Sequence, residues 1–531
     1  MPEEFVGPSV DWFALSPLLT LLGGGLFLLV VGALTPRWQR GWYAFATATT
    51  AGAAGVLAVF QWHDIIDSQP GTLVAGALAF DTFAQFMTIT ICGAVVLVSL
   101  LTDDEVRGTD REGPETFALL LMAAIGGVVM ASANDLIVLF LGLEILSLSF
   151  YVLVASDRRR SESQEGGMKY FVLGGFSSAF FLYGIALLYG GTGSTNISEI
   201  VAGFQAGVTT GREDALILAG IALLLVGLGF KVAAVPFHVW VPDVYQGAPT
   251  PVTAFMASAG KASAFAALLR VLVVALPFHR DDWRPVIWVL ALLSLVIAPM
   301  LAIMQTNVKR MLAYGSISHA GFILVAFEAA GHRAGEADPG TGMQSVVVYL
   351  MIYAVLTIGT MAIVATVSRG QAGDTRLTIL AGLASRHPAL AVTLTLLLVA
   401  QAGVPLTSGF VAKFGAIRAA VTEESYVLAV VAMAAAVIAA FVYLRIMVTV
   451  WMSSAPGADR QMLGSYLTLR SPDADAAAAA EVDLTGDDIA PEPIPLSTGV
   501  VLTFVVAFTL VVGFFPNWLL DVASNVTNYA R

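Results

Sequence analysis

The stretch GFKVAAVPFHVW, residues 229–240, ends a long apolar run with a lysine, a proline and a histidine. An unpaired ammonium is costly to bury in hydrocarbon, and a proline removes one backbone hydrogen bond from a helix. A chain that carries Lys231, Pro236 and His238 at membrane depth is expected to use them. They predict a helix that is interrupted inside a membrane, beside a polar pathway.

The composition of the whole chain favours a membrane protein. Of its 531 residues 57% are hydrophobic and 12% are charged, whereas a soluble protein carries about 25% charged residues. A spanning helix needs about 20 mostly apolar residues. The sequence contains fourteen candidates, near residues 12–34, 41–61, 79–101, 115–131, 134–155, 166–190, 214–235, 251–277, 285–304, 309–330, 343–368, 388–418, 424–453 and 496–518. We therefore expect an all-α integral membrane protein with about fourteen transmembrane helices.

The loops between these helices differ in charge. If the N-terminus lies outside, the inside loops hold fourteen Lys and Arg residues, Lys309 among them, and the outside loops hold six. Positively charged loops stay in the cytoplasm, so we expect both termini outside. Residues 454–495 are rich in Ala, Asp and Pro and lack periodicity, which predicts an acidic, low-complexity cytoplasmic loop.

Several kinds of site are excluded by the sequence. Cys92 is the only cysteine, so the chain forms no internal disulfide and binds no iron–sulfur cluster by itself. The sequence contains no P-loop, no dinucleotide-binding fingerprint after a strand and no cluster with metal-ligand spacing. We expect this chain to bind no cofactor, metal or nucleic acid.

Ionisable residues inside the predicted helices are the candidates for function. Glu144 is the deepest acid, about ten residues from either end of its helix. One interpretation is a protonated carboxyl that a neighbouring hydroxyl satisfies. The other is an ion pair with Lys169, which begins the next predicted helix. Because Lys169 lies only three residues into that helix, this pair requires an earlier helix start or a bridging water.

Other basic residues extend the candidate site. Lys261 lies about 15 Å into its helix from Pro251, Lys413 follows GVPLTSG at 403–409, and His319 lies ten residues into its helix. Lysine and histidine can gain or lose a proton as their surroundings change. We therefore expect a proton-conducting polar axis through the bundle, formed by Glu144, Lys169, Lys231, Lys261, His319 and Lys413. The remaining ionisable groups are interpreted as snorkelling arginines (Arg270, Arg445) or solvated histidines (His63, His279, His332, His387).

Two apolar segments carry helix breakers. Pro236 and Pro242 lie in one, and Gly403, Pro405 and Gly409 lie in the other. Paired breaks in corresponding segments point to inverted repeats with an ion pathway between them. We expect two inverted five-helix repeats with broken helices 7 and 12. The predicted division is helices 1–3 in 1–114, the repeats in 115–277 and 278–453, the acidic loop in 454–495 and helix 14 in 496–531.

The stretch KVAAVPFHVWVPDVYQGAPTPVTAFMASAGK, residues 231–261, resembles the antiporter-like membrane subunits of respiratory complex I. Its portion DVYQGAPTPVTAF is similar to the subunit N type. The resemblance extends over residues 134–418 through FLGLEILSLSFYVLVA, GGMKYFVLGGFSSAFFLYG, NVKRMLAYGSISHAGF and GVPLTSGFVAKF. A lysine at position 413 fits types N and L, and the absence of extra C-terminal helices speaks against type L.

The resemblance implies a proton-translocating membrane-arm subunit of a bacterial NADH-quinone oxidoreductase in the plasma membrane. It assigns Glu144 and Lys169 to a coupling ion pair, Lys231 to the central titrating position, Lys261 to a bridge and Lys413 to the broken twelfth helix. Supporting positions at and near the breaks are Pro236, His238, Asp243 and Pro405. FMN, the iron–sulfur clusters and quinone are implied in partner subunits, with subunit M and small subunits such as K as neighbours.

Two alternatives remain open from the sequence. A subunit of a multi-subunit cation/proton antiporter shares the fold and the lysines, but uses an ion gradient instead of redox energy. A passive spacer that lets neighbouring subunits pump is excluded by no residue. The spacer alternative predicts that neutralising Lys231, Lys261 or Lys413 leaves the proton-to-electron ratio unchanged.

Overall fold

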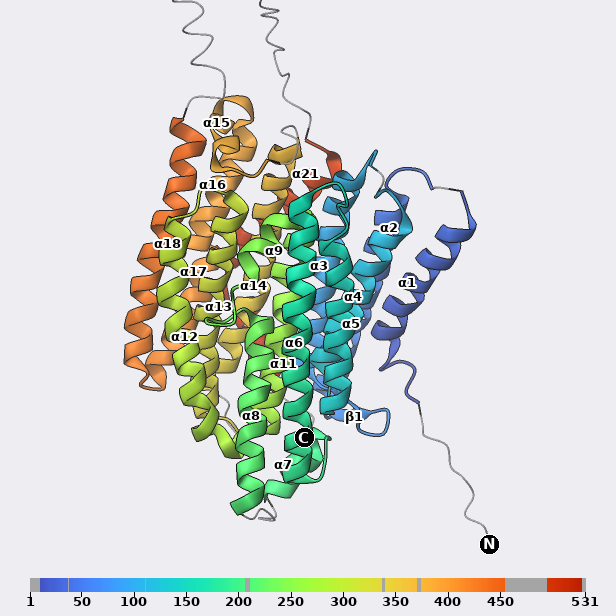
Figure 1. The fold of residues 1–531 in the computed structure, drawn as a ribbon, viewed down its shortest axis with the longest axis vertical. Helices are drawn as coiled ribbons and strands as arrows, with labels where there is room; N and C mark the ends of the chain where they lie inside the picture. Colours follow the sequence, from blue (N-terminus) through green and yellow to red (C-terminus); the bar gives the residue numbers. More distant parts are fainter. Residues whose placement is uncertain are drawn as a thin grey trace, which may run out of the picture.

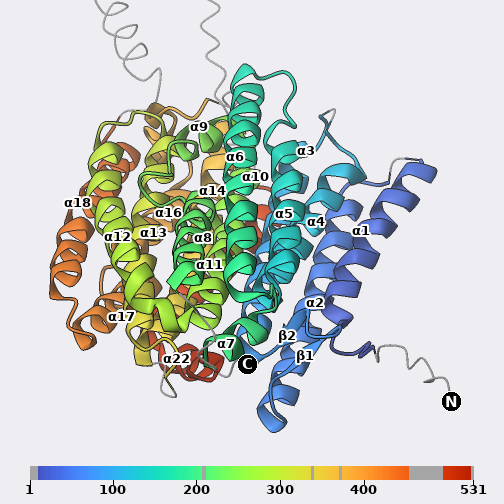
Figure 2. The ribbon, with the colours of Figure 1, turned by 60° about the horizontal axis from the view of Figure 1, so that its bottom comes forward.

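The chain is a bundle of long helices in the computed structural model, which describes residues 10–36, 38–109, 111–205, 211–336, 340–369, 374–453 and 494–527. Helices α1 and α2 lie on one flank of the bundle and α12 and α18 on the other (Figures 1 and 2). Within the described residues the only sheet is one antiparallel hairpin, β1 (Gly71–Leu73) with β2 (Leu78–Phe80). The core is therefore built by helix packing.

The helices alternate along the chain with short connections. The first part contains α1 (Ser16–Leu34), α2 (Trp42–Asp67), α3 (Thr82–Val106), α4 (Pro114–Ser132), α5 (Leu136–Val154), α6 (Ser161–Thr192), α7 (Ile197–Gln205), α8 (Gly211–Val232), α9 (Val241–Gly247), α10 (Thr250–Phe255) and α11 (Lys261–Leu269). The second part contains α12 (Arg280–Ile303), α13 (Val308–His332), α14 (Gly340–Arg369), α15 (Leu383–Arg386), α16 (Pro388–Ala402), α17 (Ser408–Thr422), α18 (Tyr426–Met452), α21 (Leu496–Phe514) and α22 (Asn517–Ser524). Two π-helical turns, Met256–Gly260 and Arg270–Ala275, flank α11.

Thirteen helical segments within the described ranges are long and apolar enough to cross a membrane. They correspond to thirteen of the fourteen predicted spans. The exception is the predicted span 388–418, which the structure divides into α16 and α17 of 15 residues each. The prediction of an all-α membrane protein is confirmed. The two inverted repeats and the division into domains stay predictions, and residues 454–493 of the predicted acidic loop lie outside the described residues.

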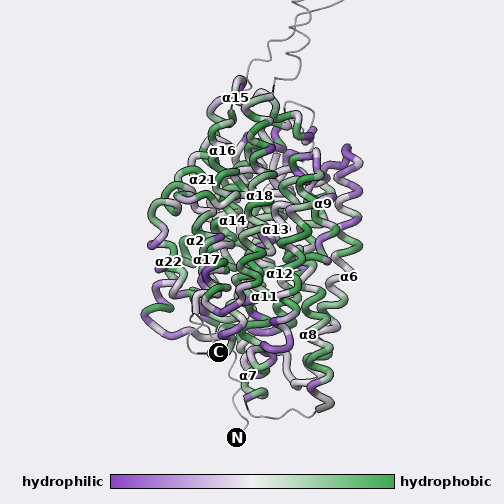
Figure 3. The backbone as a smooth tube through the Cα atoms, turned by 90° about the vertical axis from the view of Figure 1, so that its left-hand side faces the viewer, coloured by the Kyte–Doolittle hydropathy of each residue, from purple (hydrophilic) through white to green (hydrophobic). Residues whose placement is uncertain are grey.

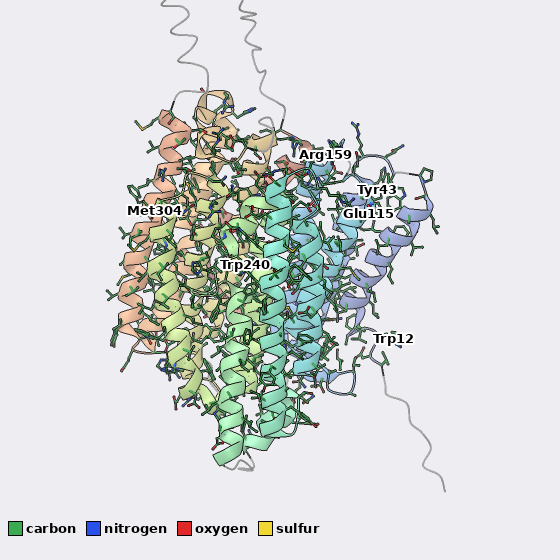
Figure 4. The ribbon with its side chains drawn as sticks, in the orientation of Figure 1. Trp12, Tyr43, Glu115, Arg159, Trp240 and Met304 are labelled. Carbon is green, nitrogen blue, oxygen red and sulfur yellow. The ribbon has the colours of Figure 1, made fainter. Side chains whose placement is uncertain are left out.

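Polarity follows the long axis of the bundle. Hydrophobic residues cover the middle of the helices, and hydrophilic residues gather towards both ends (Figure 3). Arg159 and Glu115 lie towards one end of the molecule, Trp12 lies towards the other, and Trp240 lies between them (Figure 4). This pattern matches a bundle whose middle faces hydrocarbon and whose ends face water.

The first interruption separates α8 from α9. The segment from 233 to 240 is a series of turns that includes Pro236 and His238. Protein groups satisfy the backbone at this break: the Val235 N–H donates to the Ser294 hydroxyl at 3.0 Å, and the Phe230 carbonyl at the end of α8 accepts from the Trp240 indole at 3.2 Å. Protein groups thus replace part of the lost helical ladder, as irregular backbone at membrane depth requires.

The second interruption separates α16 from α17 at residues 403–407, which include Pro405. Gly403 follows the last residue of α16 with φ of +87°, a conformation that glycine adopts without strain. Lys413 reaches back from α17 and donates to the carbonyl of Ala402 at 3.1 Å. A cation near the C-terminal end of a helix is stabilised by the helix dipole, so the break positions this lysine.

Replacing Gly409 by alanine is expected to destabilise the protein by about 1–3 kcal/mol, the usual cost of overpacking. A Cβ at Gly409 would overlap the backbone carbonyl of Ala400, which cannot move without shifting α16. Gly415→Ala is the matched control on the same helix, because its Cβ would meet the Ser345 side chain at ordinary contact distances of 3.5 Å and 3.8 Å. The thermal midpoints of the two purified variants provide the comparison. Equal midpoints would contradict the close approach of α16 and α17.

Candidate functional site

Four of the predicted site residues are buried inside the bundle on four different elements. Lys231 on α8 is 7% exposed, Lys261 at the start of α11 is 3% exposed, and Lys413 on α17 and His319 on α13 are each 5% exposed. Burial of ionisable groups is unfavourable unless hydrogen bonds replace the lost water. The partners of each group therefore show how the site is built.

Lys231 reaches from the C-terminal turn of α8 to α5. Its Nζ donates to the Ser147 hydroxyl at 2.6 Å. The ring centroids of Tyr151 and Tyr170 lie 5.8 and 5.6 Å from the same atom, within the range of cation–π attraction. Ser147 lies three residues after Glu144 on α5, so Lys231 contacts the helix face that carries Glu144.

Glu144 and Lys169 do not form the predicted ion pair in this structure. Glu144 accepts a hydrogen bond from the Ser178 hydroxyl, whereas Lys169 Nζ donates to Asp243 at 2.7 Å and to Glu165 at 2.5 Å. Helix α6 does begin earlier than predicted, at Ser161. Ser178 nevertheless lies nine residues beyond Lys169, which is about 14 Å along the helix. The two predicted partners therefore lie at different depths.

Lys261 connects α11 to the second half of the bundle. Its Nζ donates to both the hydroxyl and the carbonyl oxygen of Ser316 on α13, each at 2.6 Å. The Tyr353 ring on α14 lies 5.3 Å from the same atom. The π-helical turn Met256–Gly260 ends directly before Lys261, and such turns occur frequently at functional sites.

His319 lies one turn after Ser316 on α13 and is held from both sides. Its Nδ1 lies 2.7 Å from the Tyr349 hydroxyl, and its Nε2 lies 3.1 Å from the Tyr443 hydroxyl. A small cavity beside it is also lined by Ser316 and Gln401. Its volume of about 10 Å³ is close to what one water requires. The cavity thus lies between the serine that binds Lys261 and the imidazole.

Lys413 completes the series. Its Nζ lies 4.8 Å from the ring centroid of Phe322, which is three residues after His319 on α13. Lys231, Lys261, His319 and Lys413 therefore lie on helices that contact one another in turn. Hydroxyl groups lie at several of these contacts and can both donate and accept a proton. Such an arrangement can pass protons across the bundle.

Asp243 forms a charged cluster near the first interruption. It bonds Lys169 and also accepts from Arg310 Nη1 at 2.6 Å. Burial alone raises the pKa of the Asp243 carboxyl, but the hydrogen bonds from Lys169 and Arg310 outweigh it and keep the pKa below its usual value. Asp243 is thus the partner of Lys169 that sequence spacing did not reveal, although it lies within the quoted motif.

Two buried cations were assigned differently from the sequence. Lys309 was placed in an inside loop, but it is 1% exposed and donates to the Ala248 carbonyl at 2.5 Å. Arg270 was interpreted as a snorkelling residue, which is wrong. Its guanidinium is buried and binds both carboxylate oxygens of Asp81 at 2.6 and 2.7 Å. Their partners lie far away in the sequence, so hydropathy alone carries no signal for them.

In the described part of the chain no group of three or more His, Cys, Asp or Glu side chains is placed to hold a metal ion. The side chains gathered at the site are amines, an imidazole, a carboxyl group and hydroxyls, which can take up and release protons.

Comparison with known proteins shows the family of the chain. The family described as "NADH:quinone oxidoreductase/Mrp antiporter, TM" matches residues 133–439. NADH-quinone oxidoreductase subunit N of Mycobacterium tuberculosis strain H37Rv is 39% identical, over 85% of this chain and 91% of its own. The subunit N of Rhodococcus opacus is 38% identical, over 99% of this chain and 97% of its own.

Solved structures show the same architecture. A chain of respiratory complex I from Thermus thermophilus with bound aureothin superposes with a TM-score of 0.73 and 28% identity, covering 96% of this chain and 99% of that chain. A chain of the Mrp complex from Dietzia sp. DQ12-45-1b has a TM-score of 0.78 at 22% identity, covering 97% and 96%, which shows a shared fold. The chain thus belongs to the NADH:quinone oxidoreductase/Mrp antiporter family of membrane subunits and, within it, to the NADH-quinone oxidoreductase subunit N family.

Proposed function

We propose that this chain translocates protons as the membrane-arm subunit N of an NADH-quinone oxidoreductase. The observation that carries the proposal is the series of buried groups from Lys231 through Lys261 and His319 to Lys413, each bound to the protein on another helix or across a helix break. Buried ionisable residues in a membrane bundle mark ion pathways and proton relays. Because the chain belongs to the subunit N family, we infer that this pathway is coupled to the electron transfer of an NADH-quinone oxidoreductase.

The proposed mechanism begins with a change of charge near Lys231. Quinone reduction in another subunit reaches Glu144 and Lys169 electrostatically. Lys169, bound to Asp243 here, moves towards or away from Glu144 and so changes the potential at Lys231. The Lys231 ammonium then releases its proton, which hydroxyls and water carry to Lys261. From Lys261 the proton moves through His319 to Lys413.

The remaining assignments follow from the same proposal. FMN, the iron–sulfur clusters and quinone belong to partner subunits, and this chain contributes no redox centre. Subunit M and small subunits such as K are the proposed neighbours. The complex lies in the bacterial plasma membrane, with both termini of this chain outside. The excess of Lys and Arg in the loops at the other end supports this orientation.

A subunit of a cation/proton antiporter is the second candidate function. The matched family includes Mrp antiporters, and the fold similarity to the Mrp chain covers almost the whole protein. The identity to curated subunit N relatives over most of both chains favours the oxidoreductase.

Purification of the tagged chain in mild detergent distinguishes the two. We expect a large complex that oxidises NADH and reduces quinone. A particle that lacks flavin and NADH oxidation, but exchanges Na⁺ for H⁺ after reconstitution, would replace the oxidoreductase with the antiporter.

A further inference from the structure

A second ionisable cluster lies at the C-terminal end of α13, beyond the series described above. Glu328 and His332 lie one turn apart on α13, Arg284 approaches from α12, and Ser425 lies in the turn between α17 and α18. The Glu328 side chain is 3% exposed, while those of Arg284 and His332 are 22% and 25% exposed. His332, interpreted from the sequence as solvated, thus lies half-buried at the end of α13 beside a buried carboxylate.

Glu328 is held through both carboxylate oxygens. Its Oε2 accepts from the Ser425 hydroxyl at 2.8 Å. Its Oε1 lies 3.0 Å from His332 Nε2 and 3.4 Å from Arg284 Nη2. Arg284 Nη2 also lies 2.7 Å from His332 Nε2. One ring nitrogen thus faces a carboxylate and a guanidinium at hydrogen-bond distance.

In this geometry one proton can lie either on the Glu328 carboxyl oxygen or on His332 Nε2. A bare Nε2 accepts from Arg284, and Glu328 then bonds the ring only if its own oxygen carries the proton. A protonated Nε2 donates to ionised Glu328, but its N–H then faces the N–H groups of the Arg284 guanidinium. Because a ring nitrogen cannot donate and accept at once, neither arrangement satisfies all three groups. Moving the proton from the carboxyl oxygen to Nε2 converts one arrangement into the other.

The cluster opens towards solvent on one side. Arg284, Glu328 and His332 line a hollow of about 640 Å³, together with Trp288 and residues 422–427. Glu423, Glu424 and Tyr426 are the other titratable groups that line this hollow, and Arg333 binds Glu423 at 2.6 Å. His332 is therefore placed between a buried carboxylate and water.

The hollow lies at the end of the bundle where translocated protons have to leave. The turn that holds Ser425 is at the lower end of α18 in Figure 1, opposite the end near which Arg159 lies in Figure 4. Arg159 belongs to the loops that charge asymmetry places inside. The cluster therefore lies on the proposed outer side.

We propose that Glu328 and His332 form the proton exit of this subunit, an inference that rests on the proposed function. A proton from Lys413 passes to the Glu328 carboxylate, then to His332 Nε2, and leaves into the hollow. Phe322, which packs on Lys413, lies six residues before Glu328, about 9 Å along α13. The residues between them, 323–327, are apolar. Water has to enter this apolar segment before the proton can cross it. Between turnovers the dry segment therefore separates the buried lysines from the outer side.

Reconstitution of the whole complex in proteoliposomes tests the exit by counting protons moved per NADH oxidised. Glu328→Gln and His332→Ala are each expected to lower this ratio to the value of Lys413→Ala. Glu336→Gln is the matched control, because the carboxylate of this exposed glutamate lies near the same end and pairs with Arg280 at 3.0 Å, outside the Glu328–His332 cluster. It is expected to keep the wild-type ratio. Imidazole on both sides of the membrane is expected to restore pumping in His332→Ala and not in Lys413→Ala.

The outcomes separate the two proposals. Wild-type ratios in Glu328→Gln and His332→Ala, with a lowered ratio in Lys413→Ala, would overturn the exit and leave the proposed function intact. A wild-type ratio in Lys413→Ala would overturn the proposed function itself. If Glu328→Gln does not assemble, the imidazole response of His332→Ala decides, since loss of pumping without rescue contradicts proton transfer by the ring.

Discussion

Replacing Lys231 by alanine is expected to stop proton translocation through this subunit. Lys231 links the Glu144 face of α5 to the rest of the proposed series through its bond to Ser147. Loss of a positioned proton-transfer group slows transfer by about 100-fold or more. The measurement is proton uptake by proteoliposomes that contain the whole complex, recorded together with NADH oxidation.

Lys231→Arg separates proton transfer from charge. Arginine keeps a positive charge at this position but does not release its proton at physiological pH. We therefore expect Lys231→Arg to fail in pumping as Lys231→Ala does. Wild-type pumping in the arginine variant would show that only the charge at this position matters, and the proposed relay through Lys231 would be wrong.

Replacing Arg270 by alanine is expected to cost about 3–5 kcal/mol in the free energy of unfolding, as for other broken buried ion pairs. The guanidinium binds both oxygens of Asp81 and also donates to the Ala131 carbonyl at 2.9 Å. The Asp81 carboxylate is 0% exposed, so the variant leaves a buried charge without its countercharge. The shift of the denaturation midpoint of the purified protein measures this loss.

Two further variants test the cause of that loss. Exposed Arg376 pairs with Asp374, and Arg376→Ala is expected to leave the midpoint unchanged because water screens the pair. The double variant Asp81→Leu/Arg270→Met removes both charges and is expected to recover most of the stability. A double variant no more stable than Arg270→Ala would show that lost packing, rather than a buried charge, is the cause.

The helices could be predicted from the sequence because lipid allows few alternatives. Apolar length predicted thirteen spans, and the breakers at Pro236 and Pro405 mark the places where helices end. The span 388–418 was predicted as one membrane span with a break at 403–409, and the structure divides it there into α16 and α17. The burial of Lys231, Lys261 and Lys413 also followed from their position within apolar runs.

The partners of the charged residues could not be predicted in the same way. The sequence offered Lys169 as a partner of Glu144 because it begins the next predicted helix. In the structure Lys169 binds Asp243, which lies 74 residues later in the chain. Lys309 lies at the edge of its apolar run, two residues after Asn307, which caps α13, and hydropathy therefore assigned it to a loop. In the structure its Nζ donates to the carbonyl of Ala248 inside the bundle. Arg270 and Asp81 are 189 residues apart. Such contacts are set by tertiary packing.

The most direct test of a single proton path is the proton-to-NADH ratio of the variants Lys231→Ala, Lys261→Ala and Lys413→Ala, measured alone and with the first and last combined. Groups that act in series fail together, so the effects do not add. We predict the same lowered ratio in all four proteins. A ratio that stays at the wild-type value in any single variant, or falls further in the combination, would contradict a single path from Lys231 to Lys413.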